Sequence, residues 1–154
     1  MIPEKNIFYF IGIGGVGMSA LARYCINQGH QVFGYDQTAS EITYELINEG
    51  IEIQYDASVS SLSKNLRSQK VQVVYTSAIK KNHPQLQYYV KQGNRVTKRA
   101  KFLAELCKNR KTLAIAGTHG KTTTASILTH VFNETNQLFT SILGGFLNNN
   151  KSNL

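Results

Sequence analysis

The chain has 154 residues and a formal net charge of +8 at pH 7, with 42% hydrophobic and 17% charged residues. This composition is typical of a globular protein that buries a core, and it excludes a disordered chain. No apolar run approaches the roughly 18 residues of a membrane span, and no signal-peptide pattern precedes the first predicted strand. We therefore expect a cytoplasmic protein without a membrane partner.

The excess of basic residues indicates anionic partners, which could be nucleotides or nucleic acid. These residues gather in short groups at positions 80–81, 98–101 and 108–111, without interleaved aromatic residues. We interpret the groups as a solvated surface and expect no nucleic-acid partner. The two cysteines, Cys25 and Cys107, lack CxxC spacing and are predicted to be buried thiols.

The first predicted element is a buried strand over residues 6–11, which is rich in Ile and Phe. The glycine loop that follows reads Gly12-Ile13-Gly14-Gly15-Val16-Gly17. A helix begins after it and stops at Gly29. Glycines between a strand and a helix allow backbone N–H groups to approach a diphosphate at the helix N-terminus. A second strand over residues 31–35 ends at Asp36, about where an acidic residue binds a ribose.

Helices and strands alternate through the rest of the first domain. Helices are predicted after Ser40, around Leu62 and Leu66, from Pro84 and over residues 99–107, with strands over residues 51–54, 71–75 and 96–97. The strand over residues 71–75 ends at Thr76-Ser77-Ala78-Ile79, polar groups at the edge of a sheet where ligands bind. The pattern predicts an α/β fold with a Rossmann-like, doubly wound parallel sheet.

A second phosphate-binding pattern occurs late in the chain. Residues 113–116 have strand character and break at Gly117 into a turn that ends on Gly120-Lys121-Thr122. A helix follows, whose apolar residues are Ile127, Leu128, Val131 and Phe132. A strand, a glycine turn with Lys-Thr and a helix together form a phosphate-binding loop. In such a loop the backbone N–H groups bind phosphates, and here Lys121 would neutralise charge and the Thr122 hydroxyl would ligate Mg²⁺. The general P-loop pattern requires a glycine five residues before Gly120, where this chain has Ile115, so the loop is a shorter variant.

The two loops have to be interpreted together. The first loop alone would also suit an NAD-binding protein. A dinucleotide dehydrogenase does not require a second phosphate-binding loop, however. Two separate phosphate sites therefore indicate two nucleotide-bearing ligands.

The later loop, Gly117-Thr118-His119-Gly120-Lys121-Thr122-Thr123-Thr124, resembles the ATP loop of the Mur ligases of peptidoglycan synthesis. A histidine at position 119 resembles the sequence of those family members that act on UDP-N-acetylmuramic acid. The first glycine loop, together with Met18 and Ser19, is similar to the UDP-binding turn of the same members. The resemblance extends from the first glycine loop through residues 76–79 and 99–100 to residues 144–145. Tyr55-Asp56 departs from it, because relatives tend to carry Gly-His there, and Lys101 stands where they carry glutamate.

The resemblance implies two sets of site residues. The UDP-sugar site would consist of Gly12, Gly14, Gly15, Gly17, Met18, Ser19, Asp36, Ser77, Ala78 and Arg99. The ATP site would consist of Gly117, Thr118, His119, Gly120, Lys121, Thr122 and Thr123. Lys121 and Thr122 would be the catalytic residues, and Thr122 would hold Mg²⁺.

The resemblance also implies a reaction. ATP would phosphorylate the lactyl carboxylate of UDP-N-acetylmuramate, and the amine of L-alanine would attack the acyl phosphate to form an amide. Two alternatives stay open, namely a murein-recycling ligase that joins a peptide to the same sugar nucleotide, and a nucleotide-binding regulatory module without catalysis.

The expected domains are a UDP-sugar-binding domain over residues 1–107, a linker over 108–111 and the start of a central ATP-binding domain over 112–154. The second phosphate loop lies so late that its own domain is incomplete, so we expect this chain to be inactive by itself. The open edges of a strand over residues 113–116 would favour self-association. Asparagines 148–150 are predicted to be disordered.

Overall fold

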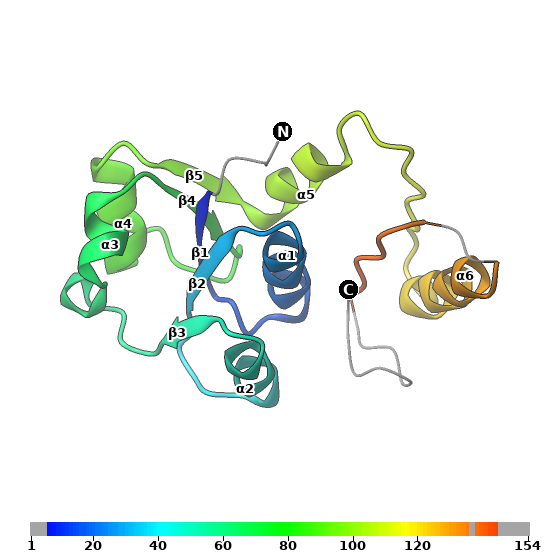
Figure 1. Cartoon of the computed structure of the whole chain (residues 1–154), viewed down its shortest axis with the longest axis horizontal. Coiled ribbons are helices and arrows are strands. Elements are labelled where there is room, and N and C mark those ends of the chain that lie inside the picture. The colour runs from blue at the N-terminus through cyan, green and yellow to red at the C-terminus, as the bar shows by residue number, and fades with distance from the viewer. Residues whose placement is uncertain (1–5, 136–137, 145–154) are drawn as a thin grey trace.

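The computed structural model of the protein describes residues 6–135 and 138–144. Its centre is a five-stranded sheet in the order β3-β2-β1-β4-β5, in which every pairing is parallel (Figure 1). The strands are β1 (Ile7–Ile11), β2 (Gln31–Tyr35), β3 (Glu52–Gln54), β4 (Val71–Tyr75) and β5 (Arg95–Lys98). The predicted doubly wound α/β sheet is confirmed. The asparagines at 148–150 and Gly145 lie outside the described residues.

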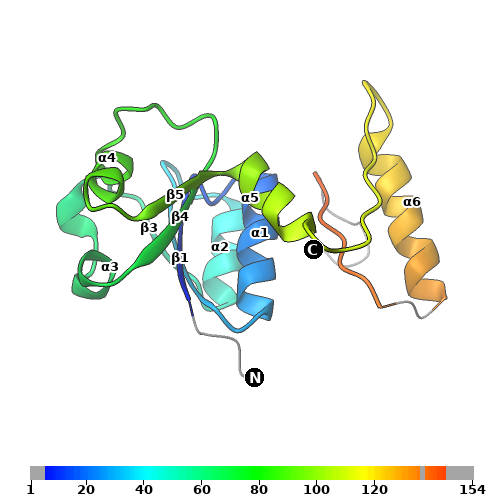
Figure 2. The same ribbon diagram turned by 90° about the horizontal axis from the view of Figure 1, so that it is seen from above.

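Helices cover both faces of the sheet (Figure 2). One face carries α1 (Val16–Asn27), α2 (Glu41–Asn48) and α5 (Arg99–Cys107). The other carries a 3-10 turn (Val59–Ser61), α3 (Lys64–Ser68) and α4 (Pro84–Lys91). No helix in the described part of the chain is both long and apolar enough to cross a membrane.

Strand β1 alternates its side chains between two hydrophobic cores. Phe8 and Phe10 pack with α1, α2 and α5. Ile7, Tyr9 and Ile11 point to the opposite face and pack with α3 and α4. Because successive side chains of a strand point to opposite faces, a strand in the middle of a covered sheet must be apolar throughout. This is why residues 7–11 form one uninterrupted apolar run.

The helix boundaries follow local signals in the sequence. Ser40 and Thr43 form a capping box at the start of α2, and Pro84 occupies the first turn of α4. Helices α1, α2 and α4 are each followed by a glycine with a positive φ angle. The Arg23 guanidinium of α1 pairs with Glu45 at 2.9 Å and Glu49 at 2.8 Å, which fastens α2 to α1.

The helical segment predicted around Leu62 and Leu66 is present as a 3-10 turn followed by the short helix α3. The strand predicted at residues 113–116 is wrong. Residues 113–116 form no strand, and Leu113 is 67% exposed. A strand is stabilised by hydrogen bonds to a neighbouring strand, and none of the described strands pairs with this segment. Apolar residues alone therefore did not produce a strand.

Helix α6 (Lys121–Glu134) follows where the sequence predicted it. Its apolar stripe is only partly covered, because Ile127 is 61% and Val131 49% exposed. The chain beyond the helix folds back along its other side. There the rings of Phe132 and Phe139 lie 5.4 Å apart, and the Thr129 and Ser141 hydroxyls hydrogen-bond at 2.7 Å.

Both cysteines are free thiols, as predicted. Cys25 is buried in the core under α1, and burial raises the pKa of its thiol to about 12. Cys107 is only half-buried at the end of α5.

Candidate functional site

All five strands are parallel, so their C-terminal ends meet at one edge of the sheet. Strand β1 lies between β2 and β4 in the sheet. The chain passes from β1 through α1 to β2 on one side of β1, and it later crosses from β3 to β4 on the other side of β1. The connections after β1 and β4 therefore diverge, and the crevice between them is where open α/β sheets bind ligands. The first glycine loop (residues 12–17) and residues 76–79 line this crevice.

The glycine loop is held to the end of β2 by backbone hydrogen bonds. The N–H groups of Gly12 and Ile13 both donate to the carbonyl of Tyr35, at 2.7 and 3.0 Å. Gly12 has a φ of +86°, and a Cβ atom there would lie 2.5 Å from the Thr76 methyl group. Only glycine satisfies both conditions, so this position sets the tight turn that leads into α1.

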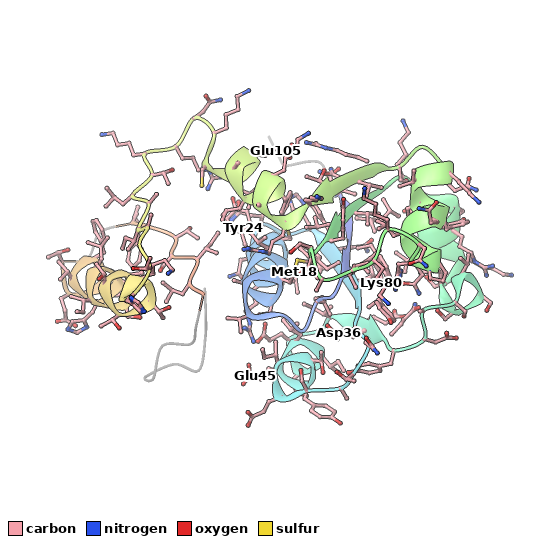
Figure 3. The ribbon with its side chains drawn as sticks, turned by 180° about the vertical axis from the view of Figure 1, so that it is seen from behind. Met18, Tyr24, Asp36, Glu45, Lys80 and Glu105 are labelled. Carbon is pink, nitrogen blue, oxygen red and sulfur yellow. The ribbon has the colours of Figure 1, made fainter. Side chains whose placement is uncertain are left out.

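Asp36 binds the glycine loop from the side of β2 (Figure 3). Its Oδ2 accepts the Gly14 N–H at 2.7 Å, and Oδ1 accepts the Thr38 N–H at 3.4 Å. A Cβ at Gly14 would meet both this carboxylate, at 2.9 Å, and the Thr43 methyl, at 3.0 Å. Asp36 therefore has a role in shaping the loop that the sequence pattern did not reveal, and the ribose contact stays a prediction.

Arg99 reaches the start of α1 from the other side of the crevice. It is the first residue of α5, directly after β5, and a Cβ at Gly17 would lie 2.9 Å from its Nη1. Within the described part of the chain its guanidinium makes no hydrogen bond or ion pair. A cation thus stands beside a helix N-terminus, where two effects favour the same anionic ligand.

Met18 and Ser19 do not present their side chains to this edge. Met18, labelled in Figure 3, is 1% exposed and Ser19 is 0% exposed. The Ser19 hydroxyl donates to the Val16 carbonyl at 2.9 Å. Both side chains stabilise the helix and the core, and the ligand contacts of these two residues stay a prediction. Ser77 and Ala78 are exposed at the C-terminal end of β4, where the sequence placed them.

The Lys121 loop (residues 117–124) is exposed at the start of α6. Gly120 adopts a left-handed conformation as the N-cap, and no side chain caps the helix. Lys121 Nζ donates to the carbonyls of Gly117 at 2.5 Å and Thr118 at 3.0 Å, which closes the loop. The open N-terminus with a lysine beside it is suited to bind phosphate. His119, Thr122 and Thr123 are exposed on the same loop.

One hydrogen bond and one ring contact at the C-terminal edge were not predicted from the sequence. The Tyr55 hydroxyl donates to Thr43 Oγ1 at 3.0 Å, so the end of β3 is joined to the start of α2. The ring of His83 lies 4.8 Å from that of Tyr35, and both of its nitrogens are buried without a described partner. Burial lowers the pKa of His83, because desolvation disfavours the imidazolium.

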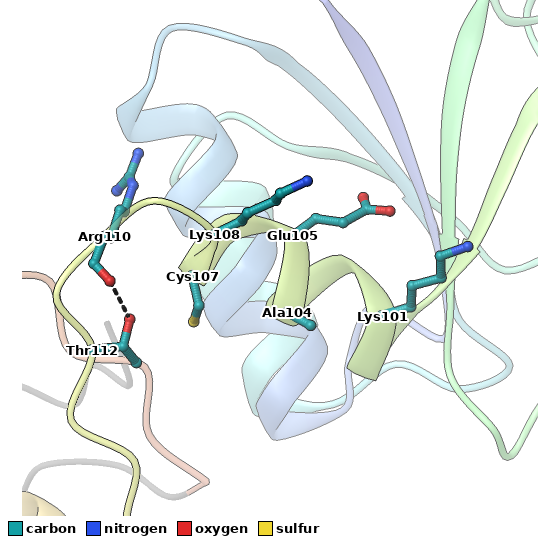
Figure 4. A pocket seen from close by; sticks show the side chains of 7 residues that line it. All are labelled: Lys101, Ala104, Glu105, Cys107, Lys108, Arg110 and Thr112. Carbon is teal, nitrogen blue, oxygen red and sulfur yellow. Dashed lines mark hydrogen bonds between the residues drawn. The ribbon is translucent and has the colours of Figure 1, made fainter.

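A shallow depression of about 560 Å³, widely open to solvent, lies between α5 and the segment that follows it (Figure 4). Its lining residues are Lys101, Ala104, Glu105, Cys107, Lys108, Arg110 and Thr112. The lining contains no residue of either phosphate loop. The Arg110 guanidinium lies 5.7 Å from the centre of the Tyr24 ring, so this region is where the connecting segment rests on α1.

Together the sheet and the glycine loop at its crevice define a Rossmann-like α/β domain. The sequence profile described as "Mur ligase family, catalytic domain" matches residues 7–111, which is more than half of the chain. The chain belongs to the Mur ligase family. The matched residues comprise the sheet domain and the segment after α5, and they end before the Lys121 loop.

The chain is similar to individual members of that family. A UDP-N-acetylmuramate–L-alanine ligase of Parabacteroides distasonis is 44% identical over 99% of this chain, which covers 33% of the relative. The solved UDP-N-acetylmuramate–alanine ligase of Thermotoga maritima matches with a TM-score of 0.86 and 27% identity over 96% of this chain and 34% of its own.

The solved UDP-N-acetylmuramate:L-alanyl-gamma-D-glutamyl-meso-diaminopimelate ligase from Neisseria meningitides matches with a TM-score of 0.85 and 25% identity, over 97% of this chain and 46% of that one. The chain thus spans about a third of the length of the curated relative.

Proposed function

We propose that the chain is the N-terminal part of an ATP-dependent ligase that joins L-alanine to UDP-N-acetylmuramate in peptidoglycan synthesis. The observation that carries this proposal is the 44% identity to an L-alanine ligase over 99% of the chain. We further propose a cytoplasmic location, where ATP and sugar nucleotides are available. The domain limits at 107 and 111 remain predictions.

In this proposal the UDP-sugar binds in the crevice at the C-terminal edge. The diphosphate lies at the N-terminus of α1, where the glycine loop admits it closely and Arg99 supplies a positive charge. Ser77 and the backbone at Ala78 are exposed on the opposite wall and offer further hydrogen bonds. Asp36 sets the loop through Gly14 and keeps lone pairs for a ribose hydroxyl.

ATP would bind at the start of α6. Lys121 would exchange the carbonyls of Gly117 and Thr118 for phosphate oxygens, and the exposed Thr122 hydroxyl would hold Mg²⁺. The described residues contain no group of three or more His, Cys, Asp or Glu side chains able to hold a metal, so Thr122 is the ligand that this segment offers. Bound Mg·ATP supplies the phosphoryl group that converts a carboxylate into an electrophile with a competent leaving group.

The second candidate is a ligase that attaches a peptide to the same sugar nucleotide. The TM-scores of 0.86 for the alanine ligase and 0.85 for the Neisseria meningitides structure do not separate the two candidates. The 44% identity to a curated L-alanine ligase favours the single amino acid. Both candidates share the UDP-sugar site, so a binding experiment tests what they have in common.

The proposal is tested by thermal unfolding of the chain with UDP-N-acetylmuramate or with NAD. The sugar nucleotide at one hundred times its dissociation constant should stabilise the fold by about 2.7 kcal/mol, or roughly 5–10 °C in melting temperature. NAD should have no effect. A shift with NAD and none with UDP-N-acetylmuramate would make the first loop a dinucleotide site and refute the proposal.

We also propose that the isolated chain self-associates through the surface beyond residue 112. The expected strand at 113–116 is absent, so the proposal now depends on the exposed apolar side chains of Leu113, Ile127 and Val131.

Light scattering should give a mass above that of one chain, and a shorter polypeptide ending at Lys108 should give the mass of a monomer. The double variant Ile127→Ser with Val131→Ser should also be monomeric. Equal monomeric masses for the full and shortened chains would show that this surface stays unpaired.

A further inference from the structure

The direction in which a sugar nucleotide lies across the crevice follows from the order of the strands. Strands β3 and β5 are the two edges of the sheet, and the chain leaves β5 through α5 toward the Lys121 loop (Figure 1). In the proposed reaction the carboxylate on the sugar must meet the phosphoryl donor at that loop. The sugar therefore points toward β5, and the nucleoside lies toward β2 and β3.

Tyr55 stands at this nucleoside end. The Asp36 N–H donates to the carbonyl of Gln54 at 3.1 Å, so the residues that follow β2 and β3 begin side by side. Asp36 in turn holds Gly14 of the glycine loop. Tyr55 is 38% exposed, so this residue is accessible to a ligand that lies beside Asp36.

The ring is held in place by two sets of contacts. Its hydroxyl donates to Thr43 Oγ1, which also exchanges hydrogen bonds with the Ser40 backbone at the cap of α2. The turn after Tyr55 is anchored by the buried Gln85, whose Nε2 donates to the carbonyl of Asp56 at 3.0 Å. Gln85 Oε1 accepts the Tyr9 hydroxyl at 2.9 Å from within the core. An ordered aromatic ring loses little entropy when it binds a ligand.

We propose that Tyr55 is the residue on which the base of the nucleotide stacks. The inference depends on the proposed UDP-sugar site and extends it to a residue at which this chain departs from the Gly-His of the family pattern. Asp36 and the loop would select ribose and diphosphate, and the ring would add affinity for any ligand that carries a base. Tyr44 provides the control, because it is a tyrosine of the neighbouring helix α2 that is 60% exposed.

The chain contains no tryptophan, so one introduced tryptophan is its only indole and can be excited selectively at wavelengths where the tyrosines do not absorb. UDP should quench the emission of a Tyr55→Trp variant and leave that of a Tyr44→Trp variant unchanged, because a stacked base lies within contact of the indole. Quenching of both variants, or of neither despite UDP binding, would contradict the stacking contact.

Affinities measured by calorimetry separate stacking from a purely structural role. Tyr55→Ala should weaken UDP binding roughly tenfold, in line with the measured range for base stacking, and should leave inorganic pyrophosphate binding unchanged. Tyr55→Phe should keep most of the affinity because the ring remains, and Tyr44→Ala should match the parent chain.

An equal loss for UDP and pyrophosphate in Tyr55→Ala would assign Tyr55 to support of the loop and overturn stacking. Unchanged UDP affinity in that variant would overturn it as well, while leaving the UDP-sugar site itself intact. Absence of UDP binding in the parent chain would instead refute the proposed function, and the inference with it.

Discussion

Replacing Gly12 by alanine should lower the free energy of unfolding by about 2–4 kcal/mol, whereas the same replacement at Gly15, the N-cap of α1, should lower it by only about 0.5–1 kcal/mol. Gly12 has a φ of +86°, and an added Cβ would lie 2.5 Å from the Thr76 methyl group. Gly15 has a φ of −68°, and its Cβ would come no nearer than 3.6 Å to the Gly12 carbonyl. Strain and overlap therefore act together only at Gly12.

Urea unfolding followed by circular dichroism measures both variants, and a double variant separates the two causes. Thr76→Ser removes the methyl group that the new Cβ would meet. The double variant Gly12→Ala with Thr76→Ser should therefore regain the part of the lost unfolding free energy that is due to overlap. It should still be destabilised by the roughly 1–2 kcal/mol due to the left-handed backbone. Equal stability of the two single alanine variants would show that the loop relaxes without cost.

Replacing Arg99 by alanine should weaken UDP-N-acetylmuramate binding by about 10- to 150-fold, which corresponds to roughly 1.5–3 kcal/mol for a hydrogen bond to a charged group. The guanidinium lies against Gly17 at the start of α1. It makes no hydrogen bond or ion pair with another described residue, so its removal should have little effect on the stability of the fold. The loss should thus appear in calorimetric titration and be almost absent from thermal unfolding without ligand.

Two matched lysine variants control for the loss of a positive charge. Lys101 is exposed on the same helix as Arg99, and Lys121 belongs to the proposed ATP loop. Lys101→Ala and Lys121→Ala should both bind the sugar nucleotide as the parent chain does, apart from a small effect of net charge that salt removes. Similar losses in all three variants would indicate general electrostatic attraction, and Arg99 would then have no specific contact with the diphosphate.

Most elements of the fold could be predicted because their signals are local. The capping box at Ser40, the proline at the start of α4 and the glycines after three helices act within a few residues of themselves. The uninterrupted apolar run of β1 likewise requires a strand that is covered on both faces. Residues 113–116 had the same apolar character but no described strand to pair with, and they formed none.

The sequence by itself determined where the glycine loop and the Lys121 loop lie and that the glycine loop opens a helix at the end of a strand. Tertiary structure decided which side chains meet there. It brought Arg99 to Gly17, directed Asp36 onto Gly14 and turned Met18 into the core. These contacts join residues that are far apart in the chain or depend on which face of a helix is covered. Strand order and helix packing determine both, and no pattern of neighbouring residues encodes them.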